Sequence, residues 1–231
     1  MKNLKLNYMM KIPIFKLKFD FFYKIKFMLK SFQILTANRP IGESKFVKIF
    51  EDKFKNLVNS KYTISCSNGT TAIDLALRAI NVKNKKVLIP SNTFFATSVA
   101  VNNAGGEIEL LDIELDSLSI CPKDLESKIS DKIGAVIIVH IGGIISKHIF
   151  NIVNICKKYN VPIIEDAAHA HCSNFKGTFA GSFAHIGCFS FFPTKVMTTA
   201  EGGMITTNNE DYFLKIKSLK NFGRDLNDSG I

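Results

Sequence analysis

The sequence of 231 residues lacks the features that mark several classes of protein. No apolar run approaches the roughly 18 residues that a membrane-spanning helix needs, so a spanning protein is excluded. The odd number of cysteines and the absence of any Cys-x-x-Cys pair exclude a disulfide framework and a zinc ribbon, and favour reduced thiols in a cytoplasmic protein. The chain has no tryptophan and only three arginines, too few to place a diphosphate clamp: Arg39, Arg78 and Arg224.

Nucleotide-binding motifs and a basic face are also missing. No Gly-x-Gly-x-x-Gly occurs and no Walker lysine follows a glycine-rich loop. The motifs that usually indicate a dinucleotide-binding fold or a nucleoside-triphosphate-binding fold are therefore missing. Of the net charge of +10, residues 1–32 hold +7, from eight lysines and the single acid Asp20, and the other 199 residues hold only +3. A nucleic-acid-binding domain would carry that charge on its folded body, so we expect no nucleic-acid partner.

The N-terminal segment is a basic leader in which lysine alternates with Phe, Ile, Leu and Met. Lysine interrupts every stretch long enough to be the core of a signal peptide. Such a segment can lie on an anionic membrane surface, but period-two alternation is not the helical pattern that an interfacial anchor needs. We therefore expect residues 1–41 to be poorly ordered, or to include sequence upstream of a later start such as Met28, and we expect no membrane contact.

We expect residues 42–231 to form one α/β domain. Hydrophobic residues make up 46% of the whole chain, which is enough to supply a core. Short apolar runs alternate with helical patterns, which is typical of a mainly parallel sheet with helices on both faces. The expected strands are 62–66, 86–90, 108–112, 135–140, 162–166, 188–191 and 203–206. The expected helices are 72–80, 96–104, 123–129, 148–159 and 210–221.

The chemistry-bearing residues follow the strands, where ligands bind in such sheets. Ser67–Thr71 precedes a helix, and its Gly69, Thr70 and Thr71 could form a phosphate site at the helix N-terminus, although Thr70 could equally be an N-cap. Phe94 follows the next strand and could stack on a planar ring, although a core phenylalanine is the simpler interpretation.

Two ionisable residues complete the set. Asp166 ends an apolar run, where a carboxylate needs a cationic partner, or where it could cap the next turn. Lys195 lies among aromatic residues after a later strand, where burial would lower its pKa and make it a nucleophile, although most lysines are merely solvated. A phosphate loop, a stacking ring, a buried carboxylate and a lysine are together what pyridoxal 5′-phosphate requires.

At these residues the sequence resembles the DegT/DnrJ/EryC1/StrS sugar aminotransferases, which have the large domain of the aspartate-aminotransferase fold (fold type I). The resemblance runs from about Gly42 to Arg224. It is carried by the segments 67–77, 90–97, 139–143, 162–169, 187–195 and 201–203.

The resemblance implies a role for each matching residue. Lys195 would form the Schiff base with the cofactor and move the proton, and Asp166 would pair with the ring nitrogen. His169 would lie by the phenolic oxygen, and Phe94 would stack on the ring. The phosphate would be held by Gly69, Thr70, Thr71 and Ser190. Related dehydratases carry histidine at the position of Lys195, so transamination is favoured.

The implied reaction moves an amino group, usually from glutamate, to a keto group of a nucleotide-linked sugar, in a cytoplasmic homodimer. The family continues into a small C-terminal domain that we expect to be missing here, so a non-catalytic remnant is an alternative. A second alternative is a metal protein, whose ligands would be His169, His171, Cys172, His185 and Cys188.

Overall fold

The computed structural model describes residues 19–36 and 44–224. The chain divides into two compact units, residues 1–41 and 42–231, and each is described by itself. Much of the basic leader, residues 1–18 and 37–41, lies outside the described residues.

The described part of the leader is a helix, α1 (Phe21–Leu35), and this differs from the poorly ordered segment expected from the sequence. Asp20 caps the helix, since its Oδ1 accepts the Tyr23 amide at 2.8 Å, and Phe19 stacks on Tyr23. This local capping and the absence of proline favour a helix even though no α1 residue is buried. Within the described residues, no helix is both long and apolar enough to cross a membrane.

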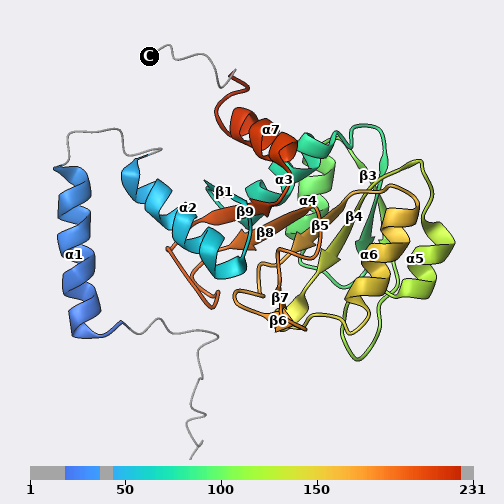
Figure 1. The fold of residues 1–231 in the computed structure, drawn as a ribbon, viewed down its shortest axis with the longest axis horizontal. Helices are drawn as coiled ribbons and strands as arrows, with labels where there is room; N and C mark the ends of the chain where they lie inside the picture. The colour runs from blue at the N-terminus through green and yellow to red at the C-terminus, as the bar shows by residue number, and fades with distance from the viewer. Residues whose placement is uncertain (1–18, 37–43, 225–231) are drawn as a thin grey trace, which may run out of the picture. The chain divides into compact units, whose positions relative to one another are not determined.

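The second unit is built on a seven-stranded sheet with the order β1-β9-β8-β5-β4-β2-β3 (Figure 1). Every neighbouring pair is parallel except the two that include β9, which runs antiparallel to both β1 and β8. The mainly parallel α/β sheet expected from the sequence is therefore confirmed. Its strands are β1 (Tyr62–Cys66), β2 (Lys86–Pro90), β3 (Glu107–Leu111), β4 (Ile133–Val139), β5 (Ile163–Asp166), β8 (Ile186–Ser190) and β9 (Gly203–Thr207).

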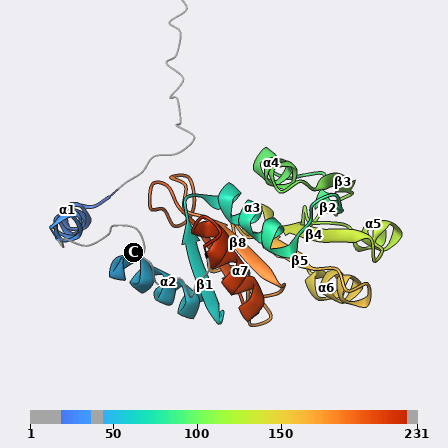
Figure 2. The ribbon, with the colours of Figure 1, turned by 90° about the horizontal axis from the view of Figure 1, so that it is seen from above.

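Helices cover both faces of this sheet (Figure 2). One face packs under α3 (Gly69–Ile80), α4 (Phe95–Asn103) and α7 (Glu210–Lys220), where Ala135, Ile137 and Val139 of β4 point. The other face packs under α2 (Lys45–Val58), α5 (Pro122–Lys128) and α6 (Ile149–Lys158), where Val136 and Ile138 point. This alternation along β4 is the period of two of a strand buried on both sides.

All seven expected strands and all five expected helices are present, with shifts of up to three residues at their ends. Besides α1, the described residues contain elements that were not among them: α2, and the small hairpin formed by β6 (Asn174–Phe175) and β7 (Thr178–Phe179). A 3₁₀ turn, Ile141–Gly143, follows β4.

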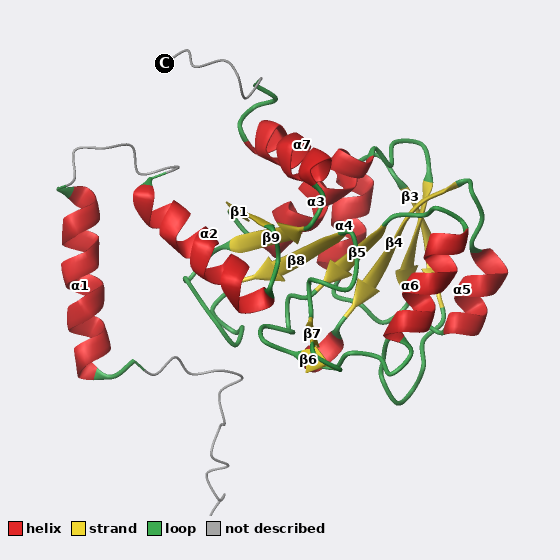
Figure 3. Cartoon of the chain, viewed as in Figure 1, coloured by secondary structure: helices red, strands yellow, loops and turns green. Residues whose placement is uncertain are grey.

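The sheet topology gathers the loops of interest at one edge (Figure 3). The strands β1, β2, β4, β5 and β8 run in the same direction, so their carboxyl ends lie at that edge. The antiparallel β9 brings its amino end there instead, since Gly203 pairs with both Cys66 and Ser190. Ligands bind at this edge in open α/β sheets.

Candidate active site

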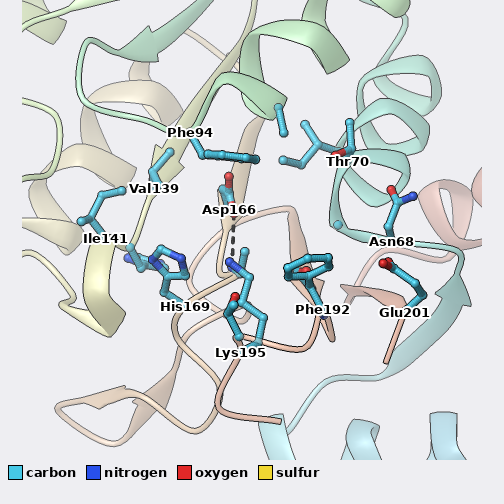
Figure 4. A pocket seen from close by; sticks show the side chains of 17 residues that line it. Asn68, Thr70, Phe94, Val139, Ile141, Asp166, His169, Phe192, Lys195 and Glu201 are labelled. Carbon is cyan, nitrogen blue, oxygen red and sulfur yellow. Dashed lines mark hydrogen bonds between the residues drawn. The ribbon is translucent and has the colours of Figure 1, made fainter. Parts of the chain in front are cut away.

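A cavity of about 520 Å³ opens at this edge (Figure 4). Its walls come from the segments that follow β1, β2, β4, β5 and β8 and from the segment that precedes β9. Seven of the eight residues predicted from the sequence line it: Gly69, Thr70, Phe94, Asp166, His169, Ser190 and Lys195. Thr71 does not line it, and its hydroxyl is instead hydrogen-bonded to Ser67 Oγ at 3.0 Å.

The N-terminus of α3 forms one wall. The N-cap is Asn68, whose Oδ1 accepts the Thr71 amide at 2.8 Å, so the suggestion that Thr70 is the cap is wrong. Gly69 lets this helix start lie against the end of β8, because a Cβ at this position would meet Ser190 Cβ at 2.8 Å. Amides at a helix N-terminus and the hydroxyls of Thr70 and Ser190 suit an anion such as phosphate.

Asp166 ends β5 and is buried at the base of the cavity. Its Oδ1 accepts the Ala168 amide at 3.2 Å, and its Oδ2 accepts the Thr97 hydroxyl at 3.1 Å. Burial raises the pKa of this carboxyl, and the two hydrogen bonds and the nearby Lys195 and His169 act in the opposite direction. A carboxylate in this position gains most from a cationic ligand in the cavity.

Lys195 lies in the loop between β8 and β9, and its side chain reaches toward Asp166 (Figure 4). Partial burial lowers the pKa of the amine, and the Asp166 carboxylate opposes that shift. A lysine whose pKa is lowered by a cavity wall has a larger fraction of free amine at neutral pH, which is the nucleophilic form.

Two rings frame the space above Lys195. Phe94 precedes α4 and lies across the cavity, with 64% of the residue exposed, so its face is free to stack on a planar ligand (Figure 4). His169 Nδ1 accepts the Gly142 amide at 3.2 Å, which leaves Nε2 as the protonated nitrogen of the neutral ring. Burial and Lys195 lower the pKa of His169, which favours this neutral form.

Sequence reasoning missed several residues of the site. Asn68 and Glu201 line the cavity, and each stands beside a glycine within a motif that the sequence analysis had singled out. Thr97 does not line the cavity but donates a hydrogen bond to Asp166 from α4, a contact between distant residues that only the structure reveals.

Glu165, beside Asp166 on the opposite face of β5, is fully buried and already satisfied. It accepts the amides of Gly181, Phe183 and Ala184 at 2.7–2.8 Å. Its Oε2 also lies 3.0 Å from His140 Nε2. These contacts hold the β7–β8 connection to the sheet, and of the two β5 carboxylates Asp166 is the one that faces the cavity.

The described residues contain no ligand set for the metal-binding alternative, since no three His, Cys, Asp or Glu side chains among them are grouped to hold an ion. His171 is instead packed against Phe54, Phe189 and Phe191, and His185 Nδ1 accepts the Ile163 amide.

The fold and the cavity define the large domain of a fold type I pyridoxal-phosphate enzyme. The chain belongs to the DegT/DnrJ/EryC1/StrS aminotransferase family, whose model matches residues 26–230. The match begins earlier than the resemblance noted from Gly42, and it includes residues 26–41 of the leader.

Individual relatives agree with this assignment. The chain is 38% identical over 194 residues to a UDP-4-amino-4,6-dideoxy-N-acetyl-beta-L-altrosamine transaminase of Campylobacter jejuni, which covers 83% of this chain and 50% of that protein. The structure of an aminotransferase from Psychrobacter cryohalolentis superposes with a TM-score of 0.83 at 32% identity, over 88% of this chain and 52% of that one. The chain thus spans about half the length of these relatives.

The cofactor of this family is pyridoxal 5′-phosphate. A GDP-4-keto-6-deoxymannose-3-dehydratase has been solved with a trapped PLP-glutamate geminal diamine, and it superposes with a TM-score of 0.73 at 26% identity, over 78% of this chain and 48% of that one. The residues of the present cavity fit the same cofactor. They supply a helix N-terminus at α3, a buried carboxylate, a half-buried amine and an exposed aromatic face.

Proposed function

We propose that this protein is an aminotransferase that moves an amino group from glutamate to a keto group of a nucleotide-linked sugar. The observation that carries the proposal is the meeting of Lys195 and Asp166 in one cavity beside the N-terminus of α3. The transaminase from Campylobacter jejuni supports the substrate class, and the trapped glutamate adduct of the dehydratase supports the donor.

In this proposal each residue of the cavity has a separate role. The α3 N-terminus with Thr70 and Ser190 would hold the phosphate, Phe94 would stack on the pyridine ring, and neutral His169 would donate from Nε2 to the phenolic oxygen. The Asp166 carboxylate holds a proton on the ring nitrogen, which keeps that nitrogen cationic.

Lys195 has two tasks in this proposal. Its amine would hold the cofactor covalently, and as a free amine it would be the base that moves the proton of the donor's α-carbon. When bound, pyridoxal 5′-phosphate supplies the electron sink for that proton transfer. The lowered pKa of Lys195 suits a base that works near neutral pH.

We also propose that a second copy of the chain is its partner and that the protein works in the cytoplasm. The residues beside the cavity include exposed apolar side chains, among them Phe95 and Val196, which suit an apolar contact. The five cysteines are all free, as expected where thiols stay reduced.

The test is borohydride reduction of the purified chain with pyridoxal 5′-phosphate, followed by peptide mass mapping. We expect one label, on Lys195, out of 27 lysines. The label is lost in Lys195→Ala and kept in Lys147→Ala, a matched variant of an exposed lysine. Labelling spread over many lysines, or none, would contradict the proposed cofactor site.

Amino transfer is then tested with glutamate on the loaded chain, by measuring 2-oxoglutarate. Formation of one equivalent supports the donor half-reaction. A chain that is labelled at Lys195 but forms no 2-oxoglutarate would bind the cofactor without turnover, which is the non-catalytic alternative.

A further inference from the structure

Three side-chain oxygen atoms form a row of hydrogen bonds beside the cavity, from the start of α4 to the end of β5. Thr97 Oγ1 donates to Asp166 Oδ2 at 3.1 Å, and Thr93 Oγ1 lies 2.8 Å from Thr97 Oγ1. Thr97 is completely buried, so bulk water does not compete for the hydrogen bonds of its hydroxyl. The two threonines stand four residues apart, around the N-terminus of α4, whose N-cap is Phe94.

The donor and acceptor in each of these hydrogen bonds follow from the number of protons that the hydroxyls carry. A threonine hydroxyl carries one proton, and the Thr97 proton is given to Asp166. The hydrogen bond between the threonines is then donated by Thr93 and accepted by Thr97 at 2.8 Å, since the other acceptor near the Thr93 hydroxyl, the Phe94 carbonyl, is farther away at 3.5 Å. Two hydroxyl dipoles are therefore aligned toward the carboxylate, and aligned hydrogen bonds in a buried site strengthen one another.

Asp166 needs such support because burial favours its neutral form. Lys195 and His169 face it from the cavity side and favour the charged form. Glu165 precedes it on β5, and the buried thiol of Cys188 lies opposite on β8. The first turn of α4 carries no acidic residue, so the positive end of that helix also favours the anion.

We propose that Thr97, backed by Thr93, is a positioning residue that holds the Asp166 carboxylate as an anion in one rotamer, ready to pair with a cationic ring nitrogen in the cavity. The Ala168 amide holds Oδ1 and the Thr97 hydroxyl holds Oδ2, so both oxygens are fixed before a ligand binds. This inference rests on the proposed function, because the cation is that of the bound pyridine ring.

Three variants of the full chain separate positioning from packing. Thr97→Val removes the hydroxyl and keeps the shape, Thr97→Ser keeps the hydroxyl and removes a methyl group, and Thr93→Val removes the outer donor only. The first readout needs no cofactor: the ¹³C carboxyl resonance of Asp166 is titrated with pH, and it is assigned by its loss in Asp166→Asn. We expect the pKa of Asp166 to rise in Thr97→Val and to stay near the wild-type value in Thr97→Ser.

The second readout is the affinity for pyridoxal 5′-phosphate, measured by absorbance titration. A hydrogen bond to a charged group contributes enough that Thr97→Val should bind about tenfold more weakly. Thr97→Ser should bind within about twofold of wild type and Thr93→Val in between, because only the first variant removes the direct bond. A purely packing role predicts the reverse order, with the serine variant the weaker.

The outcomes distinguish this inference from the proposed function. If the wild type takes the cofactor at Lys195 and Thr97→Val matches it in both affinity and Asp166 titration, the role of Thr97 is overturned and the proposed function stands. If the wild type takes no cofactor at Lys195, the proposed function falls, and the role of Thr97 toward the ring nitrogen falls with it.

Discussion

Adjacent carboxylates at the end of β5 illustrate how single residues are assigned their roles. Glu165 and Asp166 point to opposite faces of the sheet, as successive strand residues must. Glu165 is surrounded by three backbone amides and His140, whereas Asp166 receives one amide and one hydroxyl and faces the cavity. The number of donors around each carboxylate separates a structural residue from a binding residue.

His171 gives a prediction at the same scale. It is buried against three phenylalanine rings, and burial lowers its pKa from 6.5 to about 4. Between these two pH values the unfolded chain binds the proton and the folded chain does not, so stability falls as the pH drops from about 6.5 toward 4. The loss amounts to about 3 kcal/mol at one pKa unit per 1.36 kcal/mol.

The measurement is urea unfolding of the wild type and of His171→Leu at neutral pH and near pH 4.5. His169 and His185 also have lowered pKa values, so both proteins should lose stability in acid, and the variant should lose less. His148→Leu is the control for replacing a histidine by leucine at a half-exposed position. Equal losses in wild type and His171→Leu would refute the role of His171.

Residues at strand ends were predictable, and residues that act through tertiary packing were not. Asp166 and Lys195 each follow an apolar run in the sequence, and sheet topology alone brings such positions together. Thr97 is one of many threonines, and its contact with Asp166 depends on how α4 lies against β5. The same holds for Glu165, whose donors come from residues 181–184 and are set by the preceding hairpin.

At the scale of elements, α3 joins fold and site through its first turn. Asn68 caps α3 and lines the cavity, whereas Asn209 caps α7 by the same geometry, with Oδ1 accepting the Tyr212 amide at 3.0 Å, and does not line the cavity. The two caps form a natural matched pair for separating helix stability from ligand binding.

We expect Asn68→Ala and Asn209→Ala each to lower the free energy of unfolding by about 1 kcal/mol, the usual contribution of an N-cap. Only Asn68→Ala should also weaken binding of pyridoxal 5′-phosphate, because α3, unlike α7, presents its N-terminus to the cavity. Denaturant unfolding and absorbance titration measure the two effects. Equal weakening by both variants would mean that the first turn of α3 has no special part in the site.

The alternation of apolar runs and helical patterns predicted the strands. It did not predict features that depend on local capping or on pairing between distant segments. The helix α1 depends on the Asp20 cap, which one acidic residue among lysines did not reveal. The antiparallel direction of β9 is fixed by its position between β1 and β8, a contact that no local pattern encodes.

At the scale of the whole molecule, exposed apolar side chains stand next to residues that line the cavity. Phe95 is 67% exposed and Val196 is 76% exposed, and they flank the cavity-lining Phe94 and Lys195 in the sequence. Apolar groups gathered at such a place mark a contact with another protein surface.

If a second copy covers this surface, the double variant Phe95→Ser/Val196→Ser should associate about tenfold more weakly or worse, as loss of apolar anchors at an interface centre predicts. Sedimentation equilibrium over a range of protein concentration measures this. Lys195 labelling by borohydride should persist, since neither side chain lines the cavity. A wild-type chain that sediments as a monomer at every concentration would contradict the proposed partner.

The pairing of β1 with β9 has a consequence for the order in which the molecule assembles. β1 lies at the edge of the sheet and its one neighbouring strand there is β9; beside this pair the Ser60 hydroxyl bonds the carbonyl of Thr207, 147 residues later in the chain. During synthesis on the ribosome, β1 emerges early and has to wait for β9 before it can be incorporated. Contacts so distant along the chain slow folding, so the start of α3 is expected to become ordered only after β9 has been synthesised.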